Sequence, residues 1–179
     1  MAAISYIIDA LLSLLVWTFM LRVLLPLCRA DSRNPLSQGI IKFTNPLVMP
    51  LRRVLPPVGR LDLGSLTALL LVQAGSVAIL WLLAGHPLSP VPLVIATVVQ
   101  LITALLQFYL FALLIFVLLS WVAPNTYSPA GNIIASLCAP VLSPIQRVIP
   151  PIAGLDFSAV FAMIGIQALL IAMRSLSFM

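Results

Sequence analysis

The chain contains the segment NPLVMPLRRVLPP at residues 45–57 and, 94 positions later, the related segment APVLSPIQRVIPP at residues 139–151. The two segments align without a gap, and the alignment continues beyond them, since Asp62 falls on Asp156. Self-similarity at one fixed distance indicates that a single structural unit has been duplicated. In each copy a proline-rich segment precedes a long apolar segment. The sequence therefore predicts two similar units in tandem.

The composition is that of an integral membrane protein. Hydrophobic residues make up 63% of the chain and charged residues 7%, and the mean hydropathy is +1.22, whereas soluble domains are roughly half apolar and one quarter charged. Four apolar segments reach the ~20 residues that a membrane-spanning helix needs. They cover residues 4–27, 63–84, 92–122 and 157–178. We therefore expect an all-α membrane protein with four transmembrane helices.

Each expected repeat contains two of these helices joined by a long loop. The first repeat covers residues 1–85 with its loop at 29–61, and the second covers residues 91–179 with its loop at 124–155. Because two spans per repeat is an even number, both copies should insert in the same orientation. We expect parallel repeats related by an axis along the membrane normal.

Positive charge is concentrated in the two loops. Six of the nine lysine and arginine residues lie between the first and second spans, and Arg147 lies between the third and fourth. An excess of lysine and arginine marks the cytoplasmic side of a membrane. We therefore expect both repeated loops in the cytoplasm and both termini outside. This placement points to the membrane surface, and no nucleic-acid partner is expected.

The prolines of the loops are expected to permit only short amphipathic helices, because proline is tolerated in the first turn of a helix and breaks its interior. We predict one or two turns near residues 50–55, and further short helices at 36–43 and 130–137, all lying in the membrane interface. The repeated motif comprises Pro46, Pro50, Arg52, Arg53, Pro56, Pro57 and Asp62 in the first loop, and Pro140, Pro144, Arg147, Pro150, Pro151 and Asp156 in the second.

Two aspartates, Asp62 and Asp156, stand immediately before long apolar segments. A carboxylate at a helix start can accept the free backbone N–H groups and suits the positive end of the helix dipole, so both are predicted N-caps. A second role is compatible with the first. It pairs Asp62 with Arg53 and Asp156 with Arg147, or crosses those pairs between the repeats.

Polar residues follow one face of the third span, at spacings of three, three and four residues. Such residues should face the bundle interior or a water-filled space. Two interpretations stay open: hydrogen bonds between helices, worth ~0.6 kcal/mol each, or a polar path or substrate site. The intramembrane polar residues are Asp9 and Ser13 in the first span, Gln73 in the second, Thr97, Gln100, Thr103 and Gln107 in the third, and Gln167 in the fourth.

Acid–base chemistry has few candidates in this chain. It has four acidic residues, none of them glutamate, and one histidine, so general acid–base catalysis has little to work with. The sequence has no metal-ligand motif and no glycine-rich phosphate loop. Cys28 and Cys138 are interpreted as ordinary small apolar residues. We expect a protein that is not an enzyme, without a metal or a cofactor.

The duplicated motif resembles that of the YggT family of small membrane proteins, which includes the YlmG and plastid CCB3-type proteins. The resemblance rests on the prolines and arginines of residues 46–57 and the Asp62 that precedes the next apolar helix. It covers essentially the whole chain as two tandem domains. The second copy departs at Gln146, where the first has Arg52, so any role of the basic cluster belongs mainly to the first repeat.

The resemblance implies a protein of the bacterial inner membrane or of plastids, without known catalytic residues. Family members have been connected with tolerance of osmotic shock, with cell division or nucleoid distribution, and with assembly of a membrane cytochrome. A scaffold or accessory subunit that docks on other inner-membrane proteins or on anionic membrane lipid would join these roles most simply. The alternative is an oligomeric channel or transporter element in osmotic or ion homeostasis. A homo-oligomer is compatible with either hypothesis.

Overall fold

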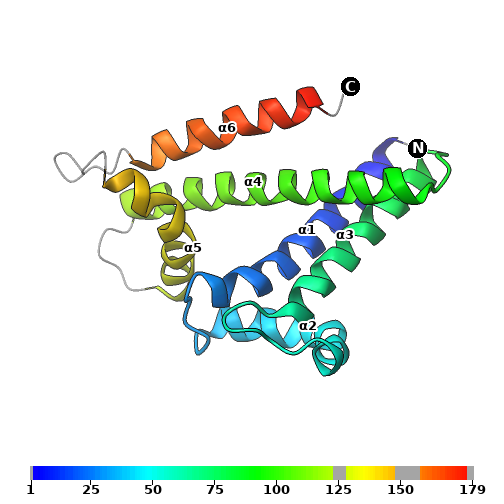
Figure 1. The fold of residues 1–179 in the computed structure, drawn as a ribbon. Coiled ribbons are helices and arrows are strands. Elements are labelled where there is room, and N and C mark those ends of the chain that lie inside the picture. The colour runs from blue at the N-terminus through cyan, green and yellow to red at the C-terminus, as the bar shows by residue number, and fades with distance from the viewer. Residues whose placement is uncertain (1, 123–127, 148–157, 177–179) are drawn as a thin grey trace.

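The computed structural model describes residues 2–122, 128–147 and 158–176 of the 179-residue chain. Within these residues the fold is all-α. The helices are α1 (Ala2–Leu27), α2 (Pro35–Val54), α3 (Leu63–Leu83), α4 (Pro90–Val122), α5 (Pro129–Gln146) and α6 (Ser158–Leu176). Helix α1 runs beside α3, and α4 beside α6, while α2 and α5 lie near one end of these pairs (Figure 1).

Three of the helices are long and apolar enough to cross a membrane. These candidate spans are Ala3–Leu27, Leu63–Leu83 and Pro90–Ser120. The chain is therefore a multi-pass membrane protein. Helix α6 is also apolar, but its stretch Ser158–Met173 is shorter than the other three. Four crossings were expected; the described helices include three that meet this criterion, and the fourth crossing stays a prediction.

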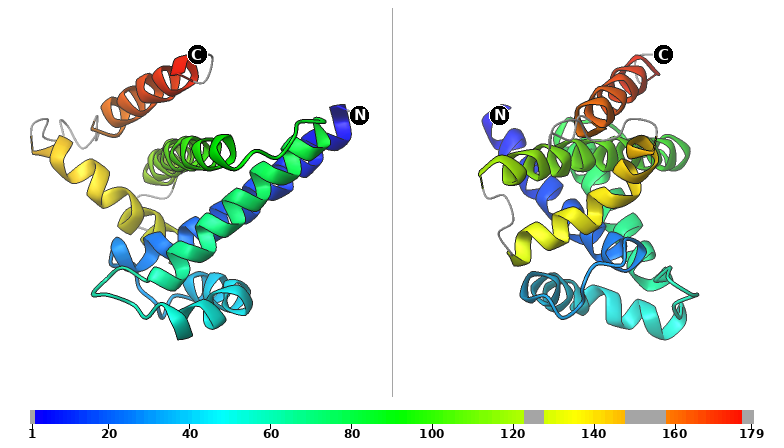
Figure 2. Two further views of the ribbon diagram at one scale, coloured as in Figure 1. Left: turned by 45° about the vertical axis from the view of Figure 1, so that its right-hand side comes forward. Right: turned by 90° about the vertical axis from the view of Figure 1, so that its left-hand side faces the viewer.

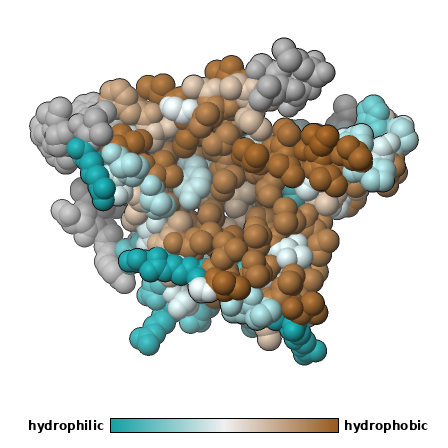
Figure 3. Space-filling view, in the orientation of Figure 1, coloured by the Kyte–Doolittle hydropathy of each residue, from teal (hydrophilic) through white to brown (hydrophobic). Residues whose placement is uncertain are grey.

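Apolar side chains form both the interior and much of the visible surface. Phe19 and Met20 of α1 are buried in one cluster with Leu113 of α4, whereas Leu71 of α3 and Val94 of α4 are exposed. Apolar residues cover the broad side of the molecule, and hydrophilic residues gather along its edges (Figure 3). A large exposed apolar surface marks a membrane contact.

Helix α4 joins the two halves of the molecule. It is unbroken for 33 residues, which corresponds to a length of about 50 Å and exceeds the ~30 Å hydrocarbon core of a bilayer. It packs against α1 and α3 in the first half and against α5 and α6 in the second. The side chains of α4 therefore decide how the halves meet.

Helices α2 and α5 begin with equivalent caps. Asn34 and Ser128 occupy the N-cap positions, and their side-chain oxygens accept hydrogen bonds of 3.0 Å from backbone N–H groups two and three residues further on. Pro35 and Pro129 follow these caps. Proline at the first helical position gives up no helical hydrogen bond and already has the required φ. The same local chemistry therefore starts both helices.

The helices in the loops are longer than predicted. Helix α2 has 20 residues and α5 has 18, so the expectation of one or two turns was wrong. The short helices predicted at 36–43 and at 50–55 are parts of one helix, α2, and the one predicted at 130–137 is part of α5. Both helices continue through prolines that were expected to end them.

The position of these prolines explains why the helices continue. Pro46 and Pro50 lie inside α2, and Pro140 and Pro144 lie inside α5, and all four are exposed. A proline leaves the carbonyl four residues earlier without its helical partner. On an exposed face, water or lipid headgroups can satisfy that carbonyl, and the helix bends instead of ending. Figure 2 shows such a bend in α2.

A tight turn brings the chain from α2 back to α3. Val58 and Leu61 exchange backbone hydrogen bonds of 2.9 and 3.1 Å. Between them, Gly59 has a φ of +61°, a conformation that glycine adopts without steric cost. The turn places Asp62, the residue before α3, beside the end of α2.

Candidate functional site

A charged pair ties the end of α2 to the start of α3. The Nε of Arg52 donates to the two carboxylate oxygens of Asp62 at 3.1 and 3.0 Å, and its Nη2 donates to Oδ2 at 2.5 Å. The Asp62 side chain is 6% exposed and that of Arg52 is 38% exposed. Contacts through two guanidinium nitrogens fix orientation as well as distance. This pair therefore sets how α2 docks on α3.

The environment of Asp62 favours its charged form. Burial opposes ionisation, but hydrogen bonds from Arg52 and from the Ser65 hydroxyl, together with the charge of Arg52, outweigh it. The pKa of the Asp62 carboxyl consequently lies below its ordinary value. Both oxygens are engaged by these side chains, so the carboxylate is fully committed within the protein.

The prediction that Asp62 is the N-cap of α3 is confirmed for its position, but its side chain makes no capping hydrogen bond, because the carboxylate is turned toward Arg52. The predicted pairing with Arg53 was wrong, because the partner of Asp62 is Arg52. Neighbouring residues point about 100° apart around a helix, so only one of the two arginines can face α3, and Arg53 is exposed.

Gly64 allows α2 to approach this closely. A Cβ atom at position 64 would lie 2.7 Å from Cγ of Arg52 and 3.0 Å from its backbone nitrogen. Gly64 is buried in the first turn of α3. The absence of a side chain is therefore a condition for the contact between Arg52 and Asp62.

The two loop helices also touch each other. The side-chain amide of Asn34 donates a 2.7 Å hydrogen bond to the backbone carbonyl of Pro129. Asn34 is buried, and its other side-chain atom caps α2. One residue therefore starts α2 and joins it to the first turn of α5.

The remaining motif residues fall into two groups. Arg53, Pro56 and Pro57 are exposed in the first half, and Arg147 is exposed at the C-cap of α5. The other group lies outside the described residues and comprises Pro150, Pro151 and Asp156. The predicted pair of Asp156 with Arg147 therefore stays a prediction.

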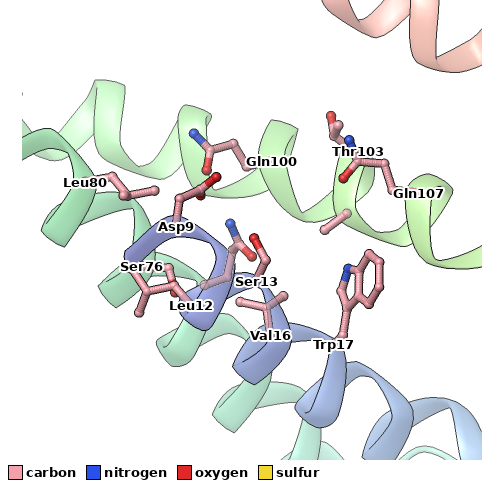
Figure 4. A pocket seen from close by; sticks show the side chains of 12 residues that line it. Asp9, Leu12, Ser13, Val16, Trp17, Ser76, Leu80, Gln100, Thr103 and Gln107 are labelled. Atoms are coloured by element: carbon pink, nitrogen blue, oxygen red, sulfur yellow. The ribbon is translucent and has the colours of Figure 1, made fainter. Parts of the chain in front are cut away.

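Most of the predicted polar stripe surrounds one cavity of about 210 Å³ between α1, α3 and α4. Asp9 of α1 points toward Gln100 of α4 (Figure 4). The cavity is large enough for several water molecules. Its polar lining residues are Asp9 and Ser13 from α1, Gln73 and Ser76 from α3, and Gln100, Thr103 and Gln107 from α4.

Two stripe residues lie elsewhere. Thr97 is buried outside the cavity, and its hydroxyl donates to the carbonyl of Leu93 at 2.7 Å. Gln167 is exposed on α6, which packs on α4 and α5 and contributes nothing to the cavity wall. Thr103, like Thr97, bonds back to a carbonyl of its own helix. Both hydroxyls therefore donate within their own helix.

Aromatic residues lie at one end of the cavity. Trp17 lines it, and the Trp17 ring lies 6.1 Å from the ring of Phe108 and 5.9 Å from that of Phe111, measured between centroids. Beyond Trp17 along α1, Phe19 and Met20 belong to the buried apolar cluster. The polar cavity therefore meets the apolar core at Trp17.

The two cysteines have the environment of small apolar residues. Cys138 is buried in α5 and Cys28 is half-buried, and both are free thiols. Burial raises the pKa of the Cys138 thiol to about 12, so it stays protonated and unreactive at neutral pH. In the part of the chain that the structure describes, no three histidine, cysteine or acidic side chains come together as metal ligands.

Sequence reasoning assigned no role to Arg22, an arginine within the first span. Arg22 of α1 is only 4% exposed, and its Nη2 donates to the side-chain oxygen of Asn45 in α2 at 3.2 Å. An arginine inside an apolar span is itself a signal of function. Its partner could not be identified because Asn45 is distant in sequence and belongs to a helix that the prolines had appeared to forbid.

Comparisons with known proteins agree with the resemblance noted in the sequence. A protein of Pseudomonas aeruginosa described as uncharacterised is 37% identical over 92% of this chain and 85% of its own length. A Vibrio alginolyticus protein described by its location in the proC 3′ region is 35% identical over 93% and 91%. The YggT protein of Escherichia coli K12 is 28% identical over 88% and 82%. No solved structure matches the chain.

The family model described as CCB3/YggT matches twice in tandem, at residues 1–83 and 95–177. Each match contains one copy of the proline-rich motif and the helices on either side of it. The chain belongs to the CCB3/YggT family.

Proposed function

We propose that this protein is a non-enzymatic scaffold or accessory subunit of the bacterial inner membrane, which docks on other inner-membrane proteins through α2 and α5. In this proposal α1 with α3, and α4 with α6, cross the membrane as two repeats in the same orientation. Helices α2 and α5 lie on the cytoplasmic surface. The clustering of lysine and arginine beside α2 supports this orientation. The scarcity of acidic residues and histidine supports a role without catalysis.

The observation that carries the proposal is the link between the two loop helices. The Asn34 side chain joins α2 to the carbonyl of Pro129 in α5, and the Arg52–Asp62 pair fixes the other end of α2 to α3. Both helices are thus held in place before any partner arrives. A pre-ordered surface loses less conformational entropy on binding than a mobile loop does.

The outer side of α2 combines apolar and positively charged residues. Phe43 and Met49 are exposed apolar residues, and Lys42 and Arg53 are exposed cations, while Val48 is fully buried on the opposite side. A cation at an anionic membrane surface contributes ~1 kcal/mol. This composition suits contact with anionic headgroups and with a partner that carries acidic residues near the membrane surface.

The test is crosslinking in native membranes followed by purification and mass spectrometry, with variants that change surface charge alone. The double variant Lys42→Gln, Arg53→Gln should reduce recovery of the partner several-fold without changing membrane insertion or thermal stability. Arg147→Gln removes one exposed arginine from the second half and should have a smaller effect. Recovery that is unchanged in the double variant would contradict docking through α2.

The polar cavity favours a second candidate, an oligomeric channel or transporter element for ions or small solutes. Asp9 supplies a charge and Gln100 and Gln107 supply amides along the cavity wall. The packing of Trp17 against Phe108 and Phe111 would have to open for a solute to pass. Purified protein in liposomes should then show ion flux that Gln107→Leu and Asp9→Asn alter. Absence of flux in oriented liposomes would exclude this candidate.

A further inference from the structure

A second cavity, of about 210 Å³, lies between the end of α1 and helix α2. Its polar lining residues are Arg22, Ser32, Ser37 and Arg52. Arg22 stands five residues before the end of α1, which is about 7.5 Å along the helix. If α1 crosses the membrane, this depth corresponds to the boundary between headgroups and acyl chains. The remaining lining includes the apolar side chains of Leu25 and Ile41.

Two buried polar atoms at this cavity have no partner among the residues that the structure describes. Nη1 of Arg22 makes no hydrogen bond, although Nη2 of the same guanidinium binds Asn45. Oγ of Ser37 also makes none, and Ser37 is 1% exposed. A buried donor left without a partner is costly to stability, so a ligand that accepts from both groups would gain hydrogen bonds without displacing any that exist.

The charges around the cavity do not cancel. Arg22 and Arg52 both line it, and Asp62 is the acidic residue that interacts with them. The Asp62 carboxylate is already taken up by Arg52 and Ser65. Within the described parts of the chain, one buried positive charge is therefore left without a counter-ion, and buried charges are normally paired.

We propose that this cavity binds the phosphate group of an anionic ligand, with Arg22 and Ser37 donating to its oxygens and Arg52 adding positive charge. Guanidinium groups suit phosphate because their fixed N–H groups match its oxygens. The chemistry fits the headgroup of an anionic phospholipid and equally a soluble phosphate compound. The site lies on the side of α2 that faces α1, apart from the exposed residues of the docking proposal, and depends on that proposal only for the placement in the membrane.

The second half of the chain lacks the residues of this site. At the positions 94 residues after Arg22, Ser37 and Arg52 stand Phe116, Gly131 and Gln146. A phosphate site should therefore exist once per chain. Saturation at one ligand per protein is a direct consequence.

The experiment measures thermal unfolding of the full-length protein in an uncharged detergent. Short-chain phosphatidylglycerol is titrated in one arm, inorganic phosphate in a second, and short-chain phosphatidylcholine in a third. A saturable rise in melting temperature with phosphatidylglycerol, much smaller with phosphatidylcholine, is expected for an anionic lipid site. An equal rise with inorganic phosphate at similar concentration would identify a soluble phosphate as the ligand.

Variants assign the response to the cavity. Arg22→Gln should weaken binding about tenfold or more, because it removes a charged donor, and Ser37→Ala about fivefold. Arg22→Lys keeps the charge and should retain part of the affinity. Arg60→Gln is the control, because Arg60 is exposed and belongs neither to the cavity lining nor to the docking surface on α2, and this variant should bind normally. If Arg22→Gln does not fold, Ser37→Ala and Arg22→Lys carry the comparison.

The proposal is overturned if no phosphate compound gives a saturable response with the wild-type protein, or if Ser37→Ala and the foldable Arg22 variants respond like wild type. An equal response to phosphatidylcholine would also overturn it, because an anionic ligand would not be required. Partner recovery measured on the same variants keeps the two proposals apart: docking depends on Lys42 and Arg53, and phosphate binding on Arg22 and Ser37.

Discussion

The two halves of the molecule share a proline-rich motif but hold their loop helices in place with different chemistry. In the first half, the polar residues Ser37 and Thr44 of α2 are buried, and Arg52 binds Asp62. In the second half, the apolar residues Ile133, Leu137 and Leu142 of α5 are buried. Gln146 stands at the position equivalent to Arg52. Among the residues that the structure describes, α2 is fixed by an ion pair and hydrogen bonds, and α5 mainly by apolar packing.

Helix α5 takes the place equivalent to α2 although Gln146 carries no charge where α2 has Arg52, so the helix arrangement does not require a cation at that position. Apolar contacts suffice to hold α5 against α4, and a buried ion pair is often no more stabilising than apolar residues of similar size. The buried polar residues of the first half are thus explained better by recognition of a ligand or partner than by a contribution to the stability of the fold. This argument is the reason for placing both the docking surface and the phosphate cavity on α2.

The largest effect is expected from Asp62→Asn, which removes the charge that compensates Arg52. Breaking a fully buried pair costs 3–5 kcal/mol, but water reaches Arg52 in part, so we expect a loss of about 2 kcal/mol in the free energy of unfolding. Unfolding in mild detergent with increasing denaturant measures it. The equivalent variant Asp156→Asn should cost less than half as much, because Gln146 supplies no positive charge in place of Arg52. Equal costs would show that the halves are stabilised alike.

A somewhat smaller effect is expected from Gly64→Ala. The added Cβ would overlap the Arg52 side chain and press on its backbone, so α2 must move away from α3. Overpacking of this kind typically costs 1–3 kcal/mol, and we expect about 1.5 kcal/mol. Gly75→Ala is the matched control, because a Cβ at position 75 of the same helix has open space. A destabilising Gly75→Ala would indicate that helix α3 itself, and not its contact with α2, is sensitive.

The long apolar helices could be predicted from the sequence because composition and length alone determine them. The expected spans at 4–27, 63–84 and 92–122 correspond closely to α1, α3 and α4. Family membership could also be predicted, since the repeated motif is local in the chain. Much of the polar stripe does line one cavity, but Gln167 does not, because the direction in which α6 packs is a tertiary property.

The loop helices and their contacts could not be predicted in the same way. Rules for proline consider one position at a time and do not say which face of a helix is exposed, so α2 and α5 were expected to be short. The choice between Arg52 and Arg53 depends on how α2 rotates against α3, and a single residue step changes the answer. Arg22 and Ser37 line the same cavity because α1 packs on α2. No sequence pattern predicts how these two helices pack.

The pH dependence of stability should also distinguish the halves. The stability that Asp62 loses on acidification is expected to be smaller than the loss caused by Gly64→Ala. The pKa of Asp62 is lowered in the folded protein, whereas an unfolded aspartate titrates near ~3.9. Below that value the unfolded state takes up the proton first, so the stability due to Asp62 is fully present above it and is lost as pH falls through the folded pKa. Melting temperatures of wild type and Asp62→Asn should therefore converge on acidification. A constant difference down to pH 3 would contradict the lowered pKa.

The smallest effect is expected from exchanging one pair of equivalent residues. Thr44 in α2 and Cys138 in α5 are 94 positions apart, and both are fully buried. The Thr44 hydroxyl bonds to the carbonyl of Ile40 at 2.7 Å, so it is satisfied within its own helix and needs no partner from another. Because the two side chains are similar in size, Thr44→Cys and Cys138→Thr should each cost less than about 1 kcal/mol. Denaturant unfolding measures both, and a thiol-specific label should reach Cys138 only after unfolding. A large cost for Cys138→Thr alone would mean that α5 cannot accommodate a hydroxyl that α2 buries, and that the second half depends on apolar packing more strictly than the first.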